Sequence, residues 1–152
     1  MYKNQRNAIQ RARISSGLTQ EALAERAGYS ADTVRAWESG MRTATLDALG
    51  ILSEALGAPW LTGVYLREQT DALNELIPEF EVGKPKAEAV ASYVSCIYDM
   101  EEMEVCRTLI RMMADGAIDD VEQPIFDKIM EIAERTTKAY FEMRFSTKKE
   151  KP

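Results

Sequence analysis

The stretch Leu18–Gly40, LTQEALAERAGYSADTVRAWESG, decides the fold of this chain. Thr19 is the expected cap of one run of good helix formers, and a second run starts at Ser30. Gly28 and Gly40 fall where these two runs should end, because glycine readily takes the left-handed conformation that follows many helices. The stretch therefore predicts two short helices joined by a tight glycine turn.

The same pattern continues on both sides of this stretch. Helices are expected at about residues 4–15, 19–27, 31–39, 46–56 behind Thr45, and 59–63. Glycines follow the first four, and the short fifth helix starts at Pro59 and ends near Gly63. Apolar residues three and four apart predict the buried helix faces. The expected core residues are Ile9, Ala12, Ile14, Leu23, Ala24, Ala27, Val34, Trp37, Leu46, Leu49, Leu52 and Leu56.

Two short helices that cross steeply through a glycine turn form a helix-turn-helix, whose second helix enters the DNA major groove. The series of residues resembles the lambda-repressor-like, or Xre/Cro, helix-turn-helix family over about residues 4–64, under half of the chain. The matching residues are Arg13, Gly17-Leu18-Thr19-Gln20, Leu23-Ala24, Gly28, Ser30, Val34, Trp37-Glu38 with Gly40, and Leu46, Leu49, Leu52 and Leu56-Gly57. The resemblance implies a compact DNA-binding domain that binds pseudo-palindromic DNA as a dimer.

The exposed positions of the second motif helix are the expected base-reading residues by this resemblance. They are Ala31, Asp32, Thr33, Arg35 and Ala36. Arg35 can bind guanine O6 and N7 through two bonds, or it can hold a phosphate. Asp32 has two interpretations, an acceptor for cytosine N4 or a carboxylate that stabilises the amino end of the helix. Thr33 can hydrogen-bond to a base or contact a thymine methyl group.

The expected phosphate contacts, again by resemblance, flank this helix. They are Gln20, Ser30, Ser39 and Arg42. Gln20 opens the first motif helix, whose amino end attracts a phosphate, although the residue is also an ordinary helix start. The chain departs from the family at Met41, where members often carry Lys, and at Ala44, where they often carry Pro.

Arg13 and Glu38 match a family pair that forms a salt bridge between the first and third helices. The role implied for this pair is structural. Removal of one partner from a fully buried pair would leave an unpaired charge inside the protein.

The composition argues against an enzyme and against a metal site. The chain has 152 residues and no histidine, so the commonest general base and the commonest metal ligand are missing. The two cysteines, Cys96 and Cys106, form no CxxC motif and are expected to be reduced thiols. No catalytic residue, metal or cofactor is predicted. We also expect no membrane span and no signal peptide, and therefore a cytoplasmic protein.

The net charge of −6 is unevenly distributed along the sequence. Residues 1–67 carry eight basic and six acidic side chains, whereas residues 68–152 carry 11 basic and 19 acidic ones. A charge difference between halves is expected when one half meets phosphate and the other does not.

The second half of the sequence is predicted to be helical as well. Expected elements are a helix at 68–77, a linker or loop at 78–85, a helix at 86–98, a helix after the possible capping box Asp99–Glu102, a polar turn at 115–120 and a last helix from 122 or 124 to 145. Whether residues 86–115 form one helix or two is open. The expected inward stripe of the last helix is Phe126, Ile129, Ala133, Thr136, Tyr140 and Met143.

The sequence therefore predicts an all-α protein. Its expected parts are a five-helix lambda-repressor-like domain at 1–66, a connecting helix and linker at 67–85, a helical dimerisation or effector region of 86–146 and a frayed tail at 147–152. The expected function is a transcriptional regulator, a dimeric repressor that inserts helix 31–39 into the major groove of a pseudo-palindromic operator. The alternative is an antitoxin-type autoregulator whose acidic C-terminal half binds a protein partner.

Overall fold

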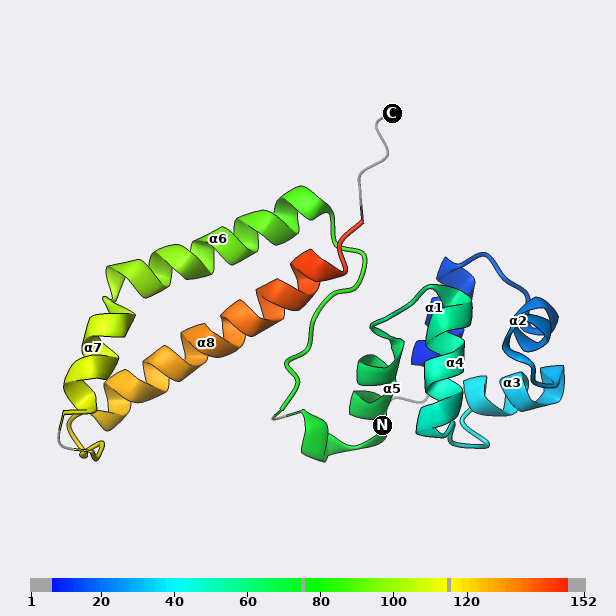
Figure 1. The fold of residues 1–152 in the computed structure, drawn as a ribbon, viewed down its shortest axis with the longest axis horizontal. Coiled ribbons are helices and arrows are strands. Elements are labelled where there is room, and N and C mark those ends of the chain that lie inside the picture. The colour runs from blue at the N-terminus through cyan, green and yellow to red at the C-terminus, as the bar shows by residue number, and fades with distance from the viewer. Residues whose placement is uncertain (1–6, 75, 115, 148–152) are drawn as a thin grey trace. The chain divides into compact units, whose positions relative to one another are not determined.

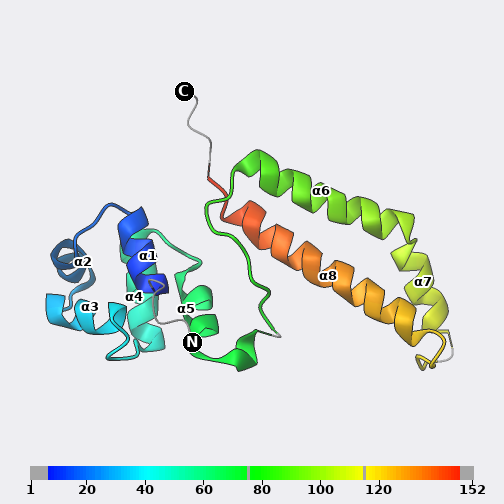
Figure 2. The same cartoon turned by 180° about the vertical axis from the view of Figure 1, so that it is seen from behind.

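The computed structural model describes residues 7–74, 76–114 and 116–147, and these residues are organised in helices (Figures 1 and 2). The elements are α1 (Ala8–Ser15), α2 (Gln20–Ala27), α3 (Ala31–Glu38), α4 (Leu46–Leu56), α5 (Leu61–Gln69), the 3-10 helix η1 (Asp71–Leu73), α6 (Lys86–Glu102), α7 (Val105–Met112) and α8 (Gln123–Arg144). The chain divides into two compact units, Met1–Ile77 and Pro78–Pro152. The predicted all-α class is confirmed. No helix within the described ranges is both long and apolar enough to cross a bilayer.

Side-chain caps start the first four helices of the first unit. In each case the capping oxygen accepts a hydrogen bond from the backbone N–H three residues further on; the caps are Asn7, Thr19, Ser30 and Thr45. Gly28 ends α2 at φ 74° and Gly57 ends α4 at φ 59°. These values lie in the left-handed region, which costs an L-residue with a side chain about 1–2 kcal/mol. Local chemistry therefore fixes the boundaries of the motif helices.

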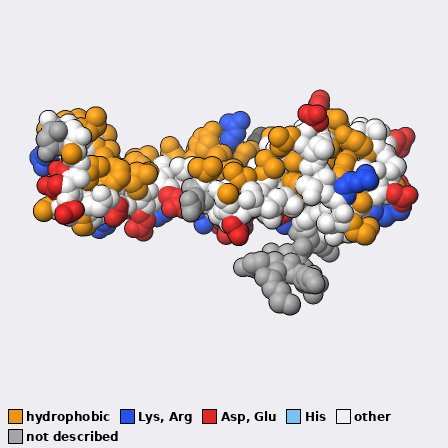
Figure 3. All heavy atoms as spheres, turned by 90° about the horizontal axis from the view of Figure 1, so that it is seen from below, with side chains coloured by type: hydrophobic (Ala, Val, Ile, Leu, Met, Phe, Trp, Pro, Cys, Tyr) orange, Lys and Arg blue, Asp and Glu red, His pale blue; other side chains and the backbone are white. Residues whose placement is uncertain are grey.

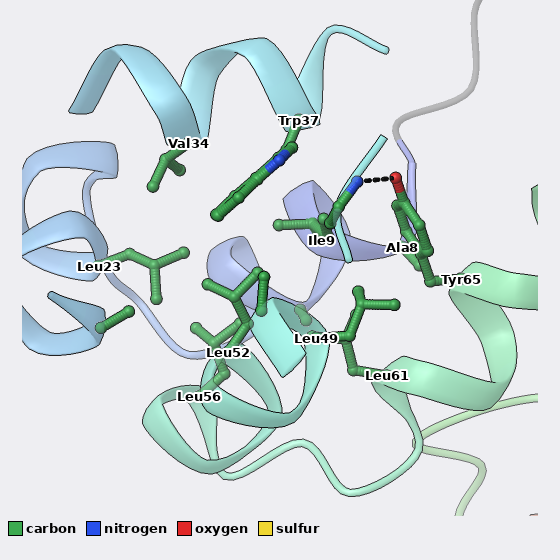
Figure 4. Packing of buried hydrophobic residues seen from close by; sticks show 14 of the residues in the cluster. Ala8, Ile9, Leu23, Val34, Trp37, Leu49, Leu52, Leu56, Leu61 and Tyr65 are labelled. Carbon is green, nitrogen blue, oxygen red and sulfur yellow. Dashed lines mark hydrogen bonds between the residues drawn. The ribbon is translucent and has the colours of Figure 1, made fainter. Parts of the chain in front are cut away.

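The core of the first unit gathers the inward faces of all five helices (Figure 4). Its large fully buried side chains are Ile9, Leu23, Val34, Leu49, Leu52, Leu61 and Tyr65. The Tyr65 hydroxyl accepts a hydrogen bond from the Ala44 backbone N–H at 3.0 Å, which joins α5 to the loop after α3. This packing holds α2 and α3 at a fixed angle.

Four predictions for this unit are wrong. Ile14 and Leu46 are 41% and 63% exposed, because Ile14 lies on the outer side of α1 and Leu46 is the first residue after the cap of α4. The fifth helix does not stop at Gly63 but continues to Gln69, because Leu61 and Tyr65 hold the same helix face in the core. The expected helix at 68–77 is replaced by the end of α5 and the short η1.

The second unit is an antiparallel hairpin of α6 and α8, with the short α7 at one end (Figures 1 and 2). The Arg135 guanidinium reaches the Asp99 carboxylate at 2.7 Å across the hairpin. Residues 86–112 form two helices, and the break comes at Glu104, which has φ 48°. The predicted capping box of Asp99 and Glu102 is therefore not formed, because both residues lie inside α6.

The expected linker at 78–85 has no helix, but it is packed against the end of α8. The ring of Phe80 stacks on Phe141 and Phe145, with centroids 5.0 and 5.8 Å apart. Lys84 Nζ lies 2.7 Å from the buried Glu142 carboxylate. We call residues 80–85 the strap. Sequence reasoning missed its packing.

The inward stripe of α8 differs from the predicted one. Ile129 is buried as expected, and Phe126, Ala133, Thr136 and Met143 are half-buried. Tyr140 is 41% exposed, and Ile132, Ala139 and Glu142 are buried instead. The buried face is therefore rotated around the helix from the predicted stripe. Of the expected frayed tail, Thr147 is bonded to the strap, and residues 148–152 lie outside the described residues.

Candidate nucleic-acid interface

Helix α3 has an inward face and an outward face. Val34 and Trp37 are 0% and 5% exposed and belong to the core. Tyr29 packs edge-on against Trp37, with ring centroids 4.8 Å apart. The predicted base-reading positions lie on the remaining surface of the helix, with Asp32 and Arg35 exposed and Ala31, Thr33 and Ala36 half-buried. The structure therefore leaves Asp32 and Arg35 on the outer surface with Thr33 and Ala36 beside them, whereas Ala31 also packs against the core.

A charged network behind α3 fixes its orientation. Arg13 donates from Nε and Nη2 to the two Glu38 carboxylate oxygens, at 2.6 and 2.9 Å. Gln20 Nε2 donates to the same carboxylate at 2.7 Å. The Glu38 side chain is only 3% exposed, and its hydrogen bond raises the pKa of Arg13 above its ordinary value. The network joins α1, α2 and α3 through one carboxylate.

The sequence predicts that Gln20 holds a phosphate. Its hydrogen bond to Glu38 limits which of its groups are available for that contact. Its amide donates to Glu38, so the side-chain N–H in that bond already has an acceptor. Thr19 Oγ1 accepts the bond from the Ala22 N–H. A phosphate at this end of α2 would therefore meet backbone N–H groups and the helix dipole more than the Gln20 amide.

Arg35 is held by two carboxylates. It pairs with Asp32 one turn earlier on α3, and its Nη2 lies 3.4 Å from Glu21 Oε1 on α2. The pKa of Glu21 is held below its ordinary value, first by its own backbone N–H and then by Arg35. Sequence reasoning missed Glu21, because nothing in the local pattern links a residue of α2 to one 14 positions later. An incoming base must break or share these pairs.

The two serines in the predicted phosphate set make local backbone bonds. Ser30 Oγ accepts from the Thr33 N–H at 3.1 Å, and the two hydroxyls are 2.8 Å apart. Ser39 Oγ donates to the Ala36 carbonyl at 3.2 Å. Arg42 is exposed and makes no ion pair with any residue in the described part of the chain. As the one cation in the predicted phosphate set, Arg42 is therefore available to a phosphate.

The net charge of the first unit, residues 1–77, is closer to zero than the net charge of residues 1–67 alone. Residues 1–77 carry eight basic and nine acidic side chains, because Glu68, Asp71 and Glu75 fall within this unit. Glu68 also accepts from Arg11 and from the Ala8 backbone N–H. Attraction to DNA must therefore come from the local arrangement of charge around α3 more than from the charge of the whole unit.

Comparison with known proteins agrees with the geometry of the first unit. A family model described as Helix-turn-helix matches residues 9–61. No curated protein and no solved structure matches the chain. The matched residues include all of α2, α3 and α4 and the turn at Gly28. Residues 9–61 are therefore a DNA-binding helix-turn-helix domain of the lambda-repressor-like (Xre) family, the kind of domain that transcription regulators use.

Proposed function

We propose that this chain is a sequence-specific transcriptional repressor that binds its operator as a homodimer. The observation that carries the proposal is the network of Arg13, Gln20 and Glu38, which holds α3 from behind while its opposite surface stays open. A recognition helix must be rigidly placed before its side chains can discriminate bases. The family match to a DNA-binding domain supports the same role.

The reading surface is sparse, so few side chains carry direct readout. The guanidinium of Arg35 can bind guanine O6 and N7 once it leaves or shares Asp32 and Glu21, a contact worth about 1–3 kcal/mol of discrimination. Ala31 and Ala36 permit close approach and contact with thymine methyl groups, and Thr33 supplies a hydroxyl. Phosphates on either side would meet the amino end of α2, the caps Ser30 and Ser39, and Arg42.

A dimer follows from the small size of the reading surface. A single module of this size buries about 600–1,000 Å² on DNA, which gives modest affinity by itself. Two linked copies read two half-sites about one helical turn apart and gain affinity through their linkage. The second unit supplies the link in this proposal, and repression follows from occlusion of a promoter.

Selection of bound DNA from a random pool, followed by footprinting, tests the proposal. We expect enrichment of a pseudo-palindromic site with two protected half-sites. The Arg107→Ala variant is a control matched to a change at Arg35, because Arg107 is an exposed arginine of α7 that pairs with Glu104. It should select the same site as the unaltered chain. Failure to enrich any sequence at low salt would refute sequence-specific binding.

A further inference from the structure

The middle of helix α6 carries almost no charge, whereas Lys86, Asp99, Glu101 and Glu102 lie at its two ends. Its residues 87–98, AEAVASYVSCIY, include one charged residue, Glu88. Only Ala89 and Cys96 of the helix are buried, whereas Val90, Val94 and Ile97 are 38%, 43% and 44% exposed. A helix that is apolar all round is normally covered on every side. One side of α6 packs on α8, and the other is uncovered in the single chain.

The exposed apolar residues of α6 lie in one stripe. Positions 90, 94 and 97 are spaced by four and three residues, which places them on one flank of the helix, about 100° round from the Ala89 and Cys96 side that packs on α8. On α8, positions 126, 130, 133, 137 and 140 follow the same spacing and are all uncharged. Of these, Met130 and Tyr140 are 52% and 41% exposed.

The two stripes fall on the same broad side of the hairpin. Two antiparallel helices are related by a local twofold axis that runs between them, perpendicular to the plane that contains both. Flanks that are rotated in the same direction around their own helices, away from the helix–helix contact, therefore lie on the same side of the hairpin. The ion pair between Asp99 and Arg135 marks the opposite side, since both residues are turned the other way from the contact line. One broad side is therefore polar and the other apolar. The space-filling view from below shows hydrophobic side chains along this unit, interspersed with charged ones (Figure 3).

We infer that this apolar face, formed by Val90, Val94 and Ile97 of α6 and Met130 and Tyr140 of α8, is where a second copy of the chain docks. The inference rests on the proposed function, because it names the surface that joins the dimer. It goes beyond that proposal by assigning the contact to one side of one hairpin, with the Asp99–Arg135 side left in solvent.

The charge pattern identifies a second copy as the partner. Residues 78–152 carry 16 acidic and 11 basic side chains, so two copies repel each other over most of their surfaces. The five residues of this face are uncharged, and Arg144, whose Nη1 lies 3.4 Å from the Tyr140 hydroxyl, borders it at one end. The face is therefore the surface at which two copies approach with least repulsion. A basic protein would instead be drawn to the acidic surfaces. Ala87 and Ala91, next to the α6 stripe, have small side chains that permit close approach of two helices.

The size of the face is of the order that a dimer needs. The 17 residues of α6 span about 25 Å, and two packed helices are about 20 Å wide. The flat area is thus about 500 Å² per copy, and its accessible area is larger because side chains project from it. Standard interfaces bury about 800 Å² per partner.

Sedimentation equilibrium of the full chain and its Val94→Glu variant tests the inference. Twofold symmetry places two new carboxylates in one interface, so we expect the dimer dissociation constant to rise at least about a hundredfold. Ser95→Glu is the matched control, because Ser95 is exposed on the same helix, turned toward the Asp99 side. It should leave the dissociation constant unchanged. The milder Val94→Ala should raise it about tenfold, and circular dichroism should show equal helicity in all variants.

The outcomes separate this inference from the proposed function. A dimer that survives Val94→Glu overturns the assigned face while leaving a dimeric regulator in place. A chain that is monomeric both alone and on its selected DNA overturns the dimer and the face together. If the Val94→Glu variant binds a single half-site with unchanged affinity, the DNA-binding unit is intact, and lost dimerisation then supports the assigned face.

Two further results would refute the assignment of this face. One is that Ser95→Glu disrupts dimerisation as much as Val94→Glu does. The other is that the chain is monomeric but forms a complex with a basic protein, and that Val94→Glu abolishes this complex. That result would assign the face to the basic protein and refute self-association.

Discussion

The Arg13–Glu38 pair makes the sharpest stability prediction. Arg13→Met removes two of the three side-chain donors to a carboxylate that is 3% exposed, and leaves the Gln20 amide. Breaking a buried pair in this way costs about 3–5 kcal/mol. Because one donor remains, we expect about 3 kcal/mol. A domain of 77 residues has a total stability of about 4–12 kcal/mol, so the loss is a large fraction.

The double variant Arg13→Met/Glu38→Leu should recover most of this loss. Removing both charges leaves no unpaired carboxylate, and replacement of a buried pair by apolar side chains is often neutral. We expect the double variant to be within about 1 kcal/mol of the unaltered chain. The large difference between the single and the double variant is therefore the diagnostic result.

Urea unfolding followed by tryptophan fluorescence measures this effect in the right part of the molecule. Both tryptophans, Trp37 and Trp60, lie in the first unit, so their emission reports its unfolding. Arg11→Met is the control, since the Arg11–Glu68 pair is 39% and 30% exposed and should contribute at most about 1 kcal/mol. A loss below about 1 kcal/mol for Arg13→Met, or a double variant as unstable as the single one, would refute the reasoning.

Four further predictions concern the DNA surface and the strap. Arg35→Ala should abolish discrimination between the selected site and random DNA in competition binding, and unchanged specificity would contradict its role. Glu21→Gln should strengthen binding to both, because it removes an exposed negative charge that pairs with Arg35. Arg42→Ala should weaken binding to all sequences and make the slope of log affinity against log salt shallower by about 1, as measured by fluorescence anisotropy. The Glu142 hydrogen bond raises the pKa of Lys84 above its ordinary value of 10.5, so the stabilisation is complete below that pH and disappears as pH rises through the raised pKa. Thermal melts followed by circular dichroism should show a greater alkaline loss of stability in the unaltered chain than in Lys84→Met, and equal losses would argue against the ion pair.

The motif helices were predictable because their boundaries depend on local chemistry. Thr19 caps α2, and Gly28 ends it in the left-handed conformation, as the sequence predicts. The length of α5 was not predictable in this way. Gly63 would end a helix that had no other support, but Leu61 and Tyr65 bury the same face on the core and carry the helix past it. Tertiary packing here outweighs local preference.

The second unit was less predictable because its decisive contacts are distant in sequence. Phe80 packs on Phe141 and Phe145, about 60 residues later. Because no nearby residue indicates this contact, the sequence around Phe80 resembles a linker. The break between α6 and α7 falls at Glu104, which takes a left-handed conformation without a glycine to mark it. The strap is therefore a consequence of packing between distant residues, whereas the break has no marker in the sequence.

The candidate site was predictable as a set of positions but not as a set of interactions. The Arg13–Glu38 pair followed from the family resemblance, and the structure places the two residues in contact. The third member, Gln20, was assigned to phosphate, although its amide bonds to Glu38. The contact between Glu21 and Arg35 depends on how α2 and α3 cross, which sequence spacing does not give.

The hydrogen bond from Ala44 to Tyr65 has a consequence for how relatives of this domain vary. A proline at position 44, common in the family, has a restricted backbone and no N–H to donate. Alanine is less restricted and has an N–H, and here the Tyr65 hydroxyl accepts it at 3.0 Å. The two positions should therefore change together during evolution, with tyrosine at 65 favoured beside a donor at 44 and phenylalanine beside proline. Covalent restraint and hydrogen bonding are then alternative solutions for holding the loop that carries Arg42.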